Sequence, residues 1–426
     1  MSPPLPPPIS SFTPKVAILG AGIIGLATAF ELAVKRGVPV TIYDPAPMGR
    51  GASWAAAGML APAYEAAAEE GVHPHLFDLC LEAAELWPDF SIDLAHAADT
   101  DSGYSGRPSL ALAFDKAETA AMHKLARALD TRGIAHEELP PATAHLLEPS
   151  IAKDLIAALQ MPTDGQVDNR AVVRALIMAL QRSPLATLRS EAAPLRSEGG
   201  HLTLEGHDLI LAAGGWNTAA IKVEENGQPL SLVNWDPALD QIDCYGGQML
   251  SVAHGYGSPE TTLRCGAIYI APKADRVIIG ATVEPGVATE TPEPDAIAAL
   301  HARAARLCPV LNDLPVIETW AGIRPGTPDR APMIGATAAQ GLAQQFGIEG
   351  FPTIKVFPKG KKNVKKFEDY NVRPTRLTGP RSLRCGCLAT IWALCSQRSV
   401  LRFATSVSDS SAGPTCHVCT HSCCQR

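Results

Sequence analysis

The chain has 426 residues, 46% of them hydrophobic and 19% charged, which is enough for two or three domains with a sizeable core. No apolar run reaches the roughly eighteen residues of a membrane-spanning helix, and the proline-rich residues 1–14, expected to be a disordered leader, lack the pattern of a signal peptide. The net charge is −7, and the acidic main body, residues 1–339, argues against nucleic acid as a partner. Because no membrane span or signal peptide is predicted, we expect a soluble, cytoplasmic protein without membrane association.

The first predicted unit, residues 15–44, consists of a strand, a glycine turn, a helix and a second strand. Its first apolar run, residues 16–19, is typical of a buried parallel strand. The three glycines that follow have the GxGxxG spacing, which gives a tight turn, a close backbone approach to a pyrophosphate and close packing of helix on strand. The helix N-terminus then offers free N–H groups and the positive end of its dipole to an anion.

The second strand of this unit, residues 38–43, ends at Asp44, where a carboxylate can accept hydrogen bonds from a ribose diol. Because the strand, the helix and the carboxylate agree, the unit predicts an adenine dinucleotide site rather than a glycine turn in an ordinary βαβ unit. The expected cofactor-binding residues of this unit are Gly20, Ala21, Gly22, Ile23, Ile24, Gly25 and Asp44.

Small residues dominate the next stretch, residues 45–62. Its simplest interpretation is a short alanine-rich helix. The functional alternative is that Ala55, Ala56, Ala57 and Gly58 let the backbone lie against a flat ring system, with main-chain N–H groups directed at its heteroatoms.

The following region alternates between predicted helices and strands. Residues 64–100 are expected to be mostly helical, and we assign their apolar residues to packing. A strand is expected at residues 109–114 and an amphipathic helix at 116–132. The turn at residues 165–168 then leads into a helix over 169–181.

An apolar strand at residues 208–213 ends in Ala-Ala-Gly-Gly, which indicates a return to the nucleotide-binding domain, so that domain is expected to be discontinuous. Residues 217–243 are polar and irregular, and we expect a surface insertion there. From Gly247 onward, short alternating strands, including 267–271 and 276–280, predict an antiparallel or mixed sheet in a substrate domain.

Arg324 lies at the end of an apolar run that begins at Trp320. The planar fork of arginine pairs bidentately with a carboxylate, so Arg324 is a candidate substrate ligand. The sequence leaves open a structural role in which it pairs with Asp329 or Glu318. A tyrosine such as Tyr269, taken alone, is more often a strand residue half in the core.

Several blocks together resemble one family, the flavin-dependent amine oxidases of the D-amino-acid oxidase type, most closely the glycine oxidases of thiamine biosynthesis. The blocks follow the family's order over most of residues 15–335, and two of them are absent from ordinary Rossmann proteins: GASWAAAGMLAP (51–62) and WAGIRPGTPD (320–329). The other blocks are GAGIIGLATAFELA (20–33), GQVDNRAVVRAL (165–176), LILAAGGWN (209–217), GQML (247–250) and YIAPKADRVIIGATVEPG (269–286).

The resemblance implies that the dinucleotide is FAD, held through its ADP half by the GxGxxG glycines and Asp44. It places Arg324 and Tyr269 on the substrate carboxylate. It implies oxidation of glycine or another small amino acid by oxygen to an imine and hydrogen peroxide, and a place in thiamine biosynthesis. The segment that it places against the isoalloxazine contributes Ser53, Ala55, Ala56, Ala57, Gly58 and Met59.

The implied fold class is α/β, with a discontinuous Rossmann-like FAD-binding domain and a mixed-sheet substrate domain within residues 15–339. A homo-oligomer stays open. The expected FAD domain comprises about residues 15–62, 165–216 and 320–339, and the expected substrate domain about 63–164 and 217–319.

The last fifth of the chain has a different composition. Residues 340–426 contain 13 Lys and Arg against 4 Asp and Glu, a charge of +9, whereas residues 1–339 carry −16. The family resemblance breaks at Gly341, and residues 343–370, within a fragment expected at 340–374, are similar to the C-terminal part of a thioredoxin fold without a preceding CxxC.

Residues 375–426 are expected to be a cysteine-rich, disordered tail; a zinc site on Cys416, Cys419, His421 and Cys423 is a weak alternative. Because the tail replaces the family's C-terminal flavin segment, an inactive or weakly FAD-binding homologue is the alternative function. An interaction protein has little support, and residues 51–62 argue against a nicotinamide dehydrogenase.

Overall fold

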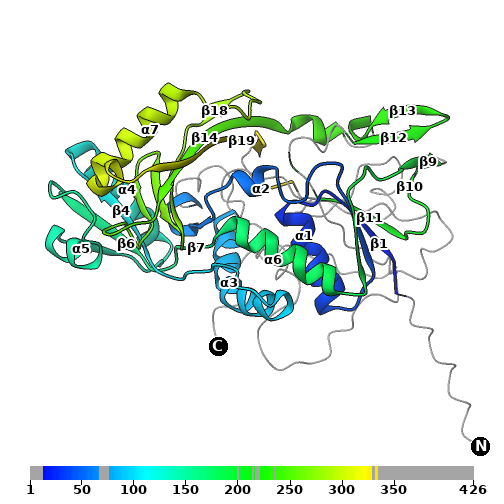
Figure 1. The fold of residues 1–426 in the computed structure, drawn as a ribbon, viewed down its shortest axis with the longest axis horizontal. Helices are drawn as coiled ribbons and strands as arrows, with labels where there is room; N and C mark the ends of the chain where they lie inside the picture. The colour runs from blue at the N-terminus through cyan, green and yellow to red at the C-terminus, as the bar shows by residue number, and fades with distance from the viewer. Residues whose placement is uncertain are drawn as a thin grey trace, which may run out of the picture.

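A computed structural model describes residues 13–66, 76–198, 201–213, 215, 221–234, 237–328 and 332–333. Figure 1 shows a parallel sheet beside α1 and α6, and a larger mixed sheet beside α4, α5 and α7. Within the described residues, no helix is long and apolar enough to span a membrane. The expected α/β class is confirmed.

The parallel sheet has the strand order β11-β1-β2-β8, and every neighbouring pair is parallel. Its strands are β1 (Val16–Leu19), β2 (Val40–Tyr43), β8 (Ala186–Arg189) and β11 (Leu209–Ala212). Since β11 pairs with β1 across almost two hundred positions of sequence, the chain does return to the first sheet as expected.

Helices cover this sheet and bury a continuous apolar core that includes Ile18, Phe30, Trp87 and Leu176. They are α1 (Ile23–Ala29), continued by η1 (Phe30–Lys35), together with α3 (Leu76–Ala98) and α6 (Asn169–Arg182). Asp168 caps α6, because its side chain accepts hydrogen bonds from the N–H groups of Arg170 and Ala171.

The mixed sheet has nine strands in the order β18-β14-β17-β16-β15-β4-β6-β5, with β19 paired to the other side of β14. Its strands are β4 (Ser109–Ala113), β5 (Glu137–Leu139), β6 (Ala157–Met161), β14 (Asp243–Ala253), β15 (Leu263–Cys265), β16 (Ile268–Pro272), β17 (Arg276–Gly280), β18 (Glu284–Pro285) and β19 (Val316–Gly326).

Alternation along these strands gives the sheet two distinct faces. Leu250, Ile270 and Ile279 lie in a core cluster with α7 (Pro294–Leu307). Met249, Tyr269 and Ile278, at alternate positions, lie in another cluster on the opposite face. The remaining helical elements are α2 (Ala52–Ala55), η2 (Pro62–Ala66), α4 (Lys116–Thr131), α5 (Pro141–Leu147), η5 (Leu232–Asn234), η6 (Pro237–Gln241) and η7 (Pro309–Asn312).

The expectation of an irregular insertion at 217–243 is wrong for part of its length. β12 (Lys222–Glu225) and β13 (Gln228–Ser231) form an antiparallel hairpin. Its turn is Asn226-Gly227, with φ of 51° and 77°, a pair that favours tight hairpin turns. β12 also pairs with β9 (Arg196–Glu198), which pairs with β10 (His201–Thr203).

Two further pairings bear on the expected domains. β3 (Met59–Leu60) pairs with β7 (Gly165–Gln166), which ties the alanine-rich stretch to the start of α6. Residues 320–326, assigned above to the FAD domain, extend the mixed sheet as part of β19. The domain limits themselves stay a prediction.

Candidate functional site

The glycine turn has the close packing that its spacing predicts. Gly20 has a φ of 104°, a conformation that favours glycine. A Cβ atom on Gly25 would lie 1.9 Å from the Gly20 carbonyl oxygen, so only glycine lets α1 begin this close to β1. Among the described residues, a Cβ atom on Gly22 would meet only the Ser53 hydroxyl, at 3.3 Å, which leaves an open approach to the backbone there.

Asp44 lies directly beside this turn. Its carboxylate accepts hydrogen bonds from the N–H of Ala21 at 2.7 Å and from the N–H of Ala46 at 2.9 Å. The side chains of Ala21, Ile23 and Ile24 are buried in the core, so these residues can face a ligand only through their backbone.

Ser53 connects the alanine-rich stretch to the glycine turn. Its hydroxyl oxygen accepts a hydrogen bond from the N–H of Ile23 at 2.9 Å, at the N-terminus of α1. Further along the stretch, Gly58 has a φ of 73° and would clash through a Cβ atom with the Val167 carbonyl oxygen at 2.2 Å. Residues 53–59, called the 53–59 segment below, therefore lie between the glycine turn and the start of α6.

Tyr269 lies on the mixed-sheet face that meets the 53–59 segment. Only 2% of it is exposed, and its hydroxyl donates a hydrogen bond to Met249 Sδ at 2.7 Å. A Cβ atom on Gly280 would lie 2.3 Å from that hydroxyl, so a glycine on β17 provides the space for the ring. The same cluster contains Ala55, Ala57, Met59 and Trp320.

Arg324 is half-buried on β19, and its guanidinium lies over Gly247 of β14. Nη1 donates to the carbonyl oxygens of Gly246 and Thr282, both at 3.2 Å. Carbonyls carry no net charge, and Arg324 has no ion pair among the described residues. Of the two structural partners considered above, Glu318 pairs with Arg170 instead, and Asp329 lies outside the described residues.

Two contacts join the 53–59 segment to the strand that carries Arg324. Trp320 donates its indole N–H to the Ala55 carbonyl oxygen at 3.0 Å. A Cβ atom on Gly322 would lie 2.3 Å from the Ala55 Cβ. Since residues 320, 322 and 324 alternate along one strand, they share the face that meets the segment. The structure thus brings the predicted residues of the turn, the segment, β16 and β19 into one chain of contacts.

These features fit a dinucleotide that carries a flat ring system. Gly22, the N-cap of α1, has no side chain to cap the helix, Ser53 takes only the Ile23 N–H, and no acidic residue lies in the first turn, so the helix N-terminus favours an anion. Asp44 lies beside the turn, and its carboxylate could accept hydrogen bonds from a ribose. Apart from Trp54 and Met59, the 53–59 segment consists of small residues, and it leads from the turn to Arg324 and Tyr269.

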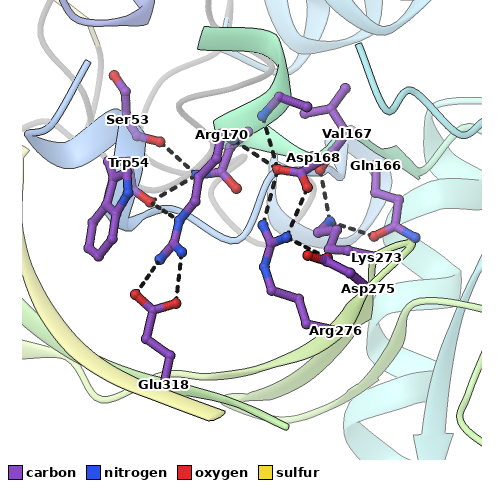
Figure 2. A network of polar contacts seen from close by, with 12 residues as sticks. Ser53, Trp54, Gln166, Val167, Asp168, Arg170, Lys273, Asp275, Arg276 and Glu318 are labelled. Carbon is purple, nitrogen blue, oxygen red and sulfur yellow. Dashed lines mark hydrogen bonds and ion pairs between the residues drawn. The ribbon is translucent and has the colours of Figure 1, made fainter. Parts of the chain in front are cut away.

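A polar network around the start of α6 was not among the predicted site residues (Figure 2). Lys273 donates to Gln166 Oε1 at 2.7 Å and to the Val167 carbonyl at 2.8 Å, and its burial lowers its pKa to about 7. Asp168 pairs with Arg276 at 3.1 Å. Burial opposes ionisation of Asp168, but the hydrogen bond and charge of Arg276 outweigh it and lower the pKa of Asp168.

The sequence contained a signal for this network, because residues 165–176 form one of the blocks quoted above. That block was assigned no site residue. In the described part of the chain, no group of His, Cys, Asp and Glu side chains could hold a metal ion. The weak zinc alternative, the thioredoxin-like fragment and the cysteine-rich tail all lie outside the described residues.

Comparison with known families gives one match that spans the site. The family described as "FAD dependent oxidoreductase" (DAO) matches residues 15–354. The match therefore extends beyond Gly341, where the sequence analysis places the break.

Known relatives are similar over most of this chain. The bifunctional protein ThiO/ThiG of Trichormus variabilis is 29% identical over 353 residues, which are 79% of this chain and 50% of that protein. The glycine oxidase of Geobacillus kaustophilus is 30% identical over 333 residues, which are 75% of this chain and 83% of that enzyme. The chain spans about half the length of the bifunctional relatives that it matches.

Solved structures agree with these relatives. The crystal structure of glycine oxidase from Geobacillus kaustophilus has a TM-score of 0.65 and 28% identity, and the match covers 76% of this chain and 86% of that one. Iminodiacetate oxidase from Chelativorans sp. BNC1 has a TM-score of 0.63 at 24% identity, over 76% of this chain and 88% of that one, which shows a shared fold.

Proposed function

This chain belongs to the family of FAD-dependent oxidoreductases, and we propose that it oxidises glycine or another small amino acid to an imine, with oxygen as the electron acceptor and hydrogen peroxide as a product. The relatives named glycine oxidase and the ThiO part of the bifunctional relative support this substrate class. A role in thiamine biosynthesis follows from the family resemblance and is part of the proposal.

The glycine turn, Asp44 and the 53–59 segment are the residues proposed to hold FAD. Gly22 would admit the pyrophosphate, the N-terminus of α1 would face its charge, and Asp44 would accept hydrogen bonds from the ribose. The segment would lie along the isoalloxazine. When bound, FAD supplies the acceptor for the hydride that leaves the substrate Cα.

The single observation that carries the substrate proposal is the environment of Arg324. A half-buried guanidinium with no carboxylate partner among the described residues has charge and donors left for a ligand. Its two carbonyl acceptors fix Nη1, which leaves the rest of the fork available for bidentate pairing with a carboxylate.

Tyr269 is proposed to add a hydrogen bond to the same carboxylate. It lies on the same sheet face, and its single O–H, which donates to Met249 Sδ in this structure, would turn to donate to the bound carboxylate. Fixing the carboxylate orients the Cα of a small amino acid. Since hydride removal from Cα needs a neutral amine and accurate alignment rather than an obligatory side-chain base, positioning provides most of the rate.

Steady-state peroxide release by the FAD-loaded protein tests this proposal. Glycine and other small amino acids should give peroxide. Arg324→Ala should raise KM, by an amount that corresponds to a loss of roughly 2 to 4 kcal/mol in binding free energy, because the substrate carboxylate loses its charge-assisted partner. Flavin content, read from the visible absorption of the purified variant, should stay the same.

Two results would contradict the proposal. An unchanged KM in Arg324→Ala would make this arginine structural. The absence of peroxide with every small amino acid tested, from a protein that does contain FAD, would exclude the oxidase activity.

A further inference from the structure

The two residues that begin α6 hold the backbone of the 53–59 segment directly. Asn169 Nδ2 donates to the carbonyl oxygen of Ser53 at 2.8 Å and to that of Trp54 at 3.0 Å. Arg170 Nε donates to the same Trp54 carbonyl at 3.4 Å. The segment is thus fixed at its first two residues by side chains more than a hundred positions away.

Arg170 also contacts the Trp54 side chain and the strand that carries Arg324. Its guanidinium carbon lies 3.8 Å from the ring centroid of Trp54 and 4.9 Å from that of Trp320. Nη1 and Nη2 donate to the two carboxylate oxygens of Glu318, at 2.7 and 3.3 Å. Figure 2 shows the guanidinium between Trp54 and Glu318, with its fork directed at the carboxylate.

This arrangement uses two properties that arginine has and lysine lacks, a flat face and a fork of donors. The flat face covers the indole, and the two ends of the fork pair with one carboxylate, which fixes the direction of the side chain. The Arg170 side chain is 14% exposed and that of Glu318 is 32% exposed, so solvent screens the ion pair only in part. Glu318 and Trp320 lie on β19, on the same face as Arg324.

We infer that Arg170 is a positioning residue that holds the 53–59 segment against β19 and so sets the distance between the cofactor-lining segment and Arg324. The inference about backbone positioning depends on the contacts alone. Its consequence for FAD and substrate rests on the proposed function.

Hydrogen exchange of the apoprotein tests the positioning itself. Arg170→Met removes the fork, the charge and the stacking while it keeps an apolar side chain of similar length. Amides of the 53–59 segment should then exchange faster than in the parent, by roughly tenfold or more, because the segment loses its link through Arg170 to Glu318 and keeps the hydrogen bond from Trp320 to Ala55. The matched control is Arg174→Met, which changes an exposed arginine one turn later on α6 and should leave the segment unchanged.

Glu318→Ala removes the same ion pair by changing its partner on β19. It therefore tests the inference even if Arg170→Met does not fold. It should also accelerate exchange in the segment. Arg170→Lys keeps the charge without the fork or the flat face, and it should fall between parent and Arg170→Met. Unchanged exchange of the segment in both Arg170→Met and Glu318→Ala overturns the inference.

FAD titration and steady-state kinetics then separate positioning from general stability. Arg170→Met should weaken FAD binding, change the shape of the bound flavin's visible spectrum and raise the KM for the amino acid, with a combined loss in kcat/KM of roughly tenfold to a hundredfold. If the parent oxidises no amino acid, the proposed function fails, yet the exchange result still decides the inference. A parent-like spectrum, FAD affinity and KM in Arg170→Met would contradict the functional consequence.

Discussion

At the scale of single residues, three glycines on adjacent strands make room for the groups of the site. Gly247, Gly280 and Gly322 lie on one face of β14, β17 and β19. Cβ atoms there would lie 2.4 Å from the Arg324 guanidinium, 2.3 Å from the Tyr269 hydroxyl and 2.3 Å from the Ala55 Cβ. The absence of side chains at these positions is therefore as important for the site as the side chains that it contains.

This leads to a prediction for Gly247→Ala. The added methyl group has to displace the guanidinium, since contacts shorter than 3.0 Å do not occur without a shift. The charge stays while its position changes, so KM for the amino acid should rise roughly tenfold or more with FAD content unchanged. Gly215→Ala is the control, because among the described residues its Cβ would meet only Pro325, at an ordinary 3.7 Å. Equal KM values for parent and Gly247→Ala would show that Arg324 does not bind the substrate.

Gly22 gives a second prediction at this scale. Gly22→Val would fill the open approach to the turn beside Ser53 and should abolish flavin retention. The absorption spectrum of the purified variant measures this. Gly51→Ala adds a methyl group into open space nearby and should keep its flavin. A Gly22→Val protein with the flavin content of the parent would disprove the assignment of the pyrophosphate site.

At the scale of secondary-structure elements, Asp164 ties η2 to the mixed sheet. It accepts hydrogen bonds from the N–H groups of Ala63 and Tyr64 and from the hydroxyl of Ser109 on β4. Burial raises the pKa of its carboxyl to about 7. η2, which follows the 53–59 segment, therefore depends on a carboxyl group that stays protonated at a higher pH than an ordinary aspartate does.

The raised pKa of Asp164 makes the stability of the fold depend on pH. An unfolded chain releases this proton near pH 4, whereas the folded protein holds it to about pH 7. Because the folded state binds more protons between these values, the Asp164 contribution makes folding less favourable as the pH rises from about 4 to 7. Asp164→Asn, which cannot ionise, should gain stability relative to the parent over this interval. Urea unfolding at pH 5 and pH 7 measures it, and parallel pH profiles would contradict it.

At the scale of the whole molecule, residues 1–339, which are acidic, and residues 340–426, which are basic, are expected to contribute differently to FAD binding. The ADP half of FAD is proposed to be bound by residues 20–44, independently of the tail. Hydrogen-bond donors near N1 and C2=O of a flavin stabilise the negative charge of its reduced form, and losing one such donor typically costs about 3 kcal/mol of that stabilisation. The family's C-terminal flavin segment, which residues 341–426 replace, would provide these donors. We therefore expect weak FAD binding and slow glycine oxidation from the chain as it stands.

Replacing residues 341–426 with a C-terminus of the family type should restore tight FAD binding and peroxide production. Truncation after residue 340 is the control, since it removes the tail without supplying donors. Peroxide release with glycine is measured for the unaltered chain, the truncated chain and the chain with the replaced C-terminus, and only the last should show full activity. Full activity in the unaltered chain would mean that residues 341–426 supply the donors themselves.

Local geometry explains which features could be predicted from the sequence. The glycine turn depends on contiguous residues, and its spacing alone required the positive φ at Gly20 and the close contact at Gly25. The helix expected at 116–132 agrees with α4, whose cap at Asp115 is also local. The turn of the β12–β13 hairpin is equally local, because the Asn226-Gly227 pair itself favours a tight hairpin turn.

Long-range pairing explains the rest. The choice of β14 as the neighbour of both β17 and β19, and the register that places Arg324 opposite Tyr245, depend on side-chain packing between distant strands. Arg170 and Glu318 are separated by 148 positions, so nothing in either local sequence indicates their ion pair. The sequence by itself determined the strand, glycine turn, helix and strand of residues 15–44, because these follow from short-range spacing, and it predicted the residue types of the site. Only the tertiary structure decided which sheet face meets the 53–59 segment and which arginine holds it there, because those contacts form between strands and helices far apart in the chain.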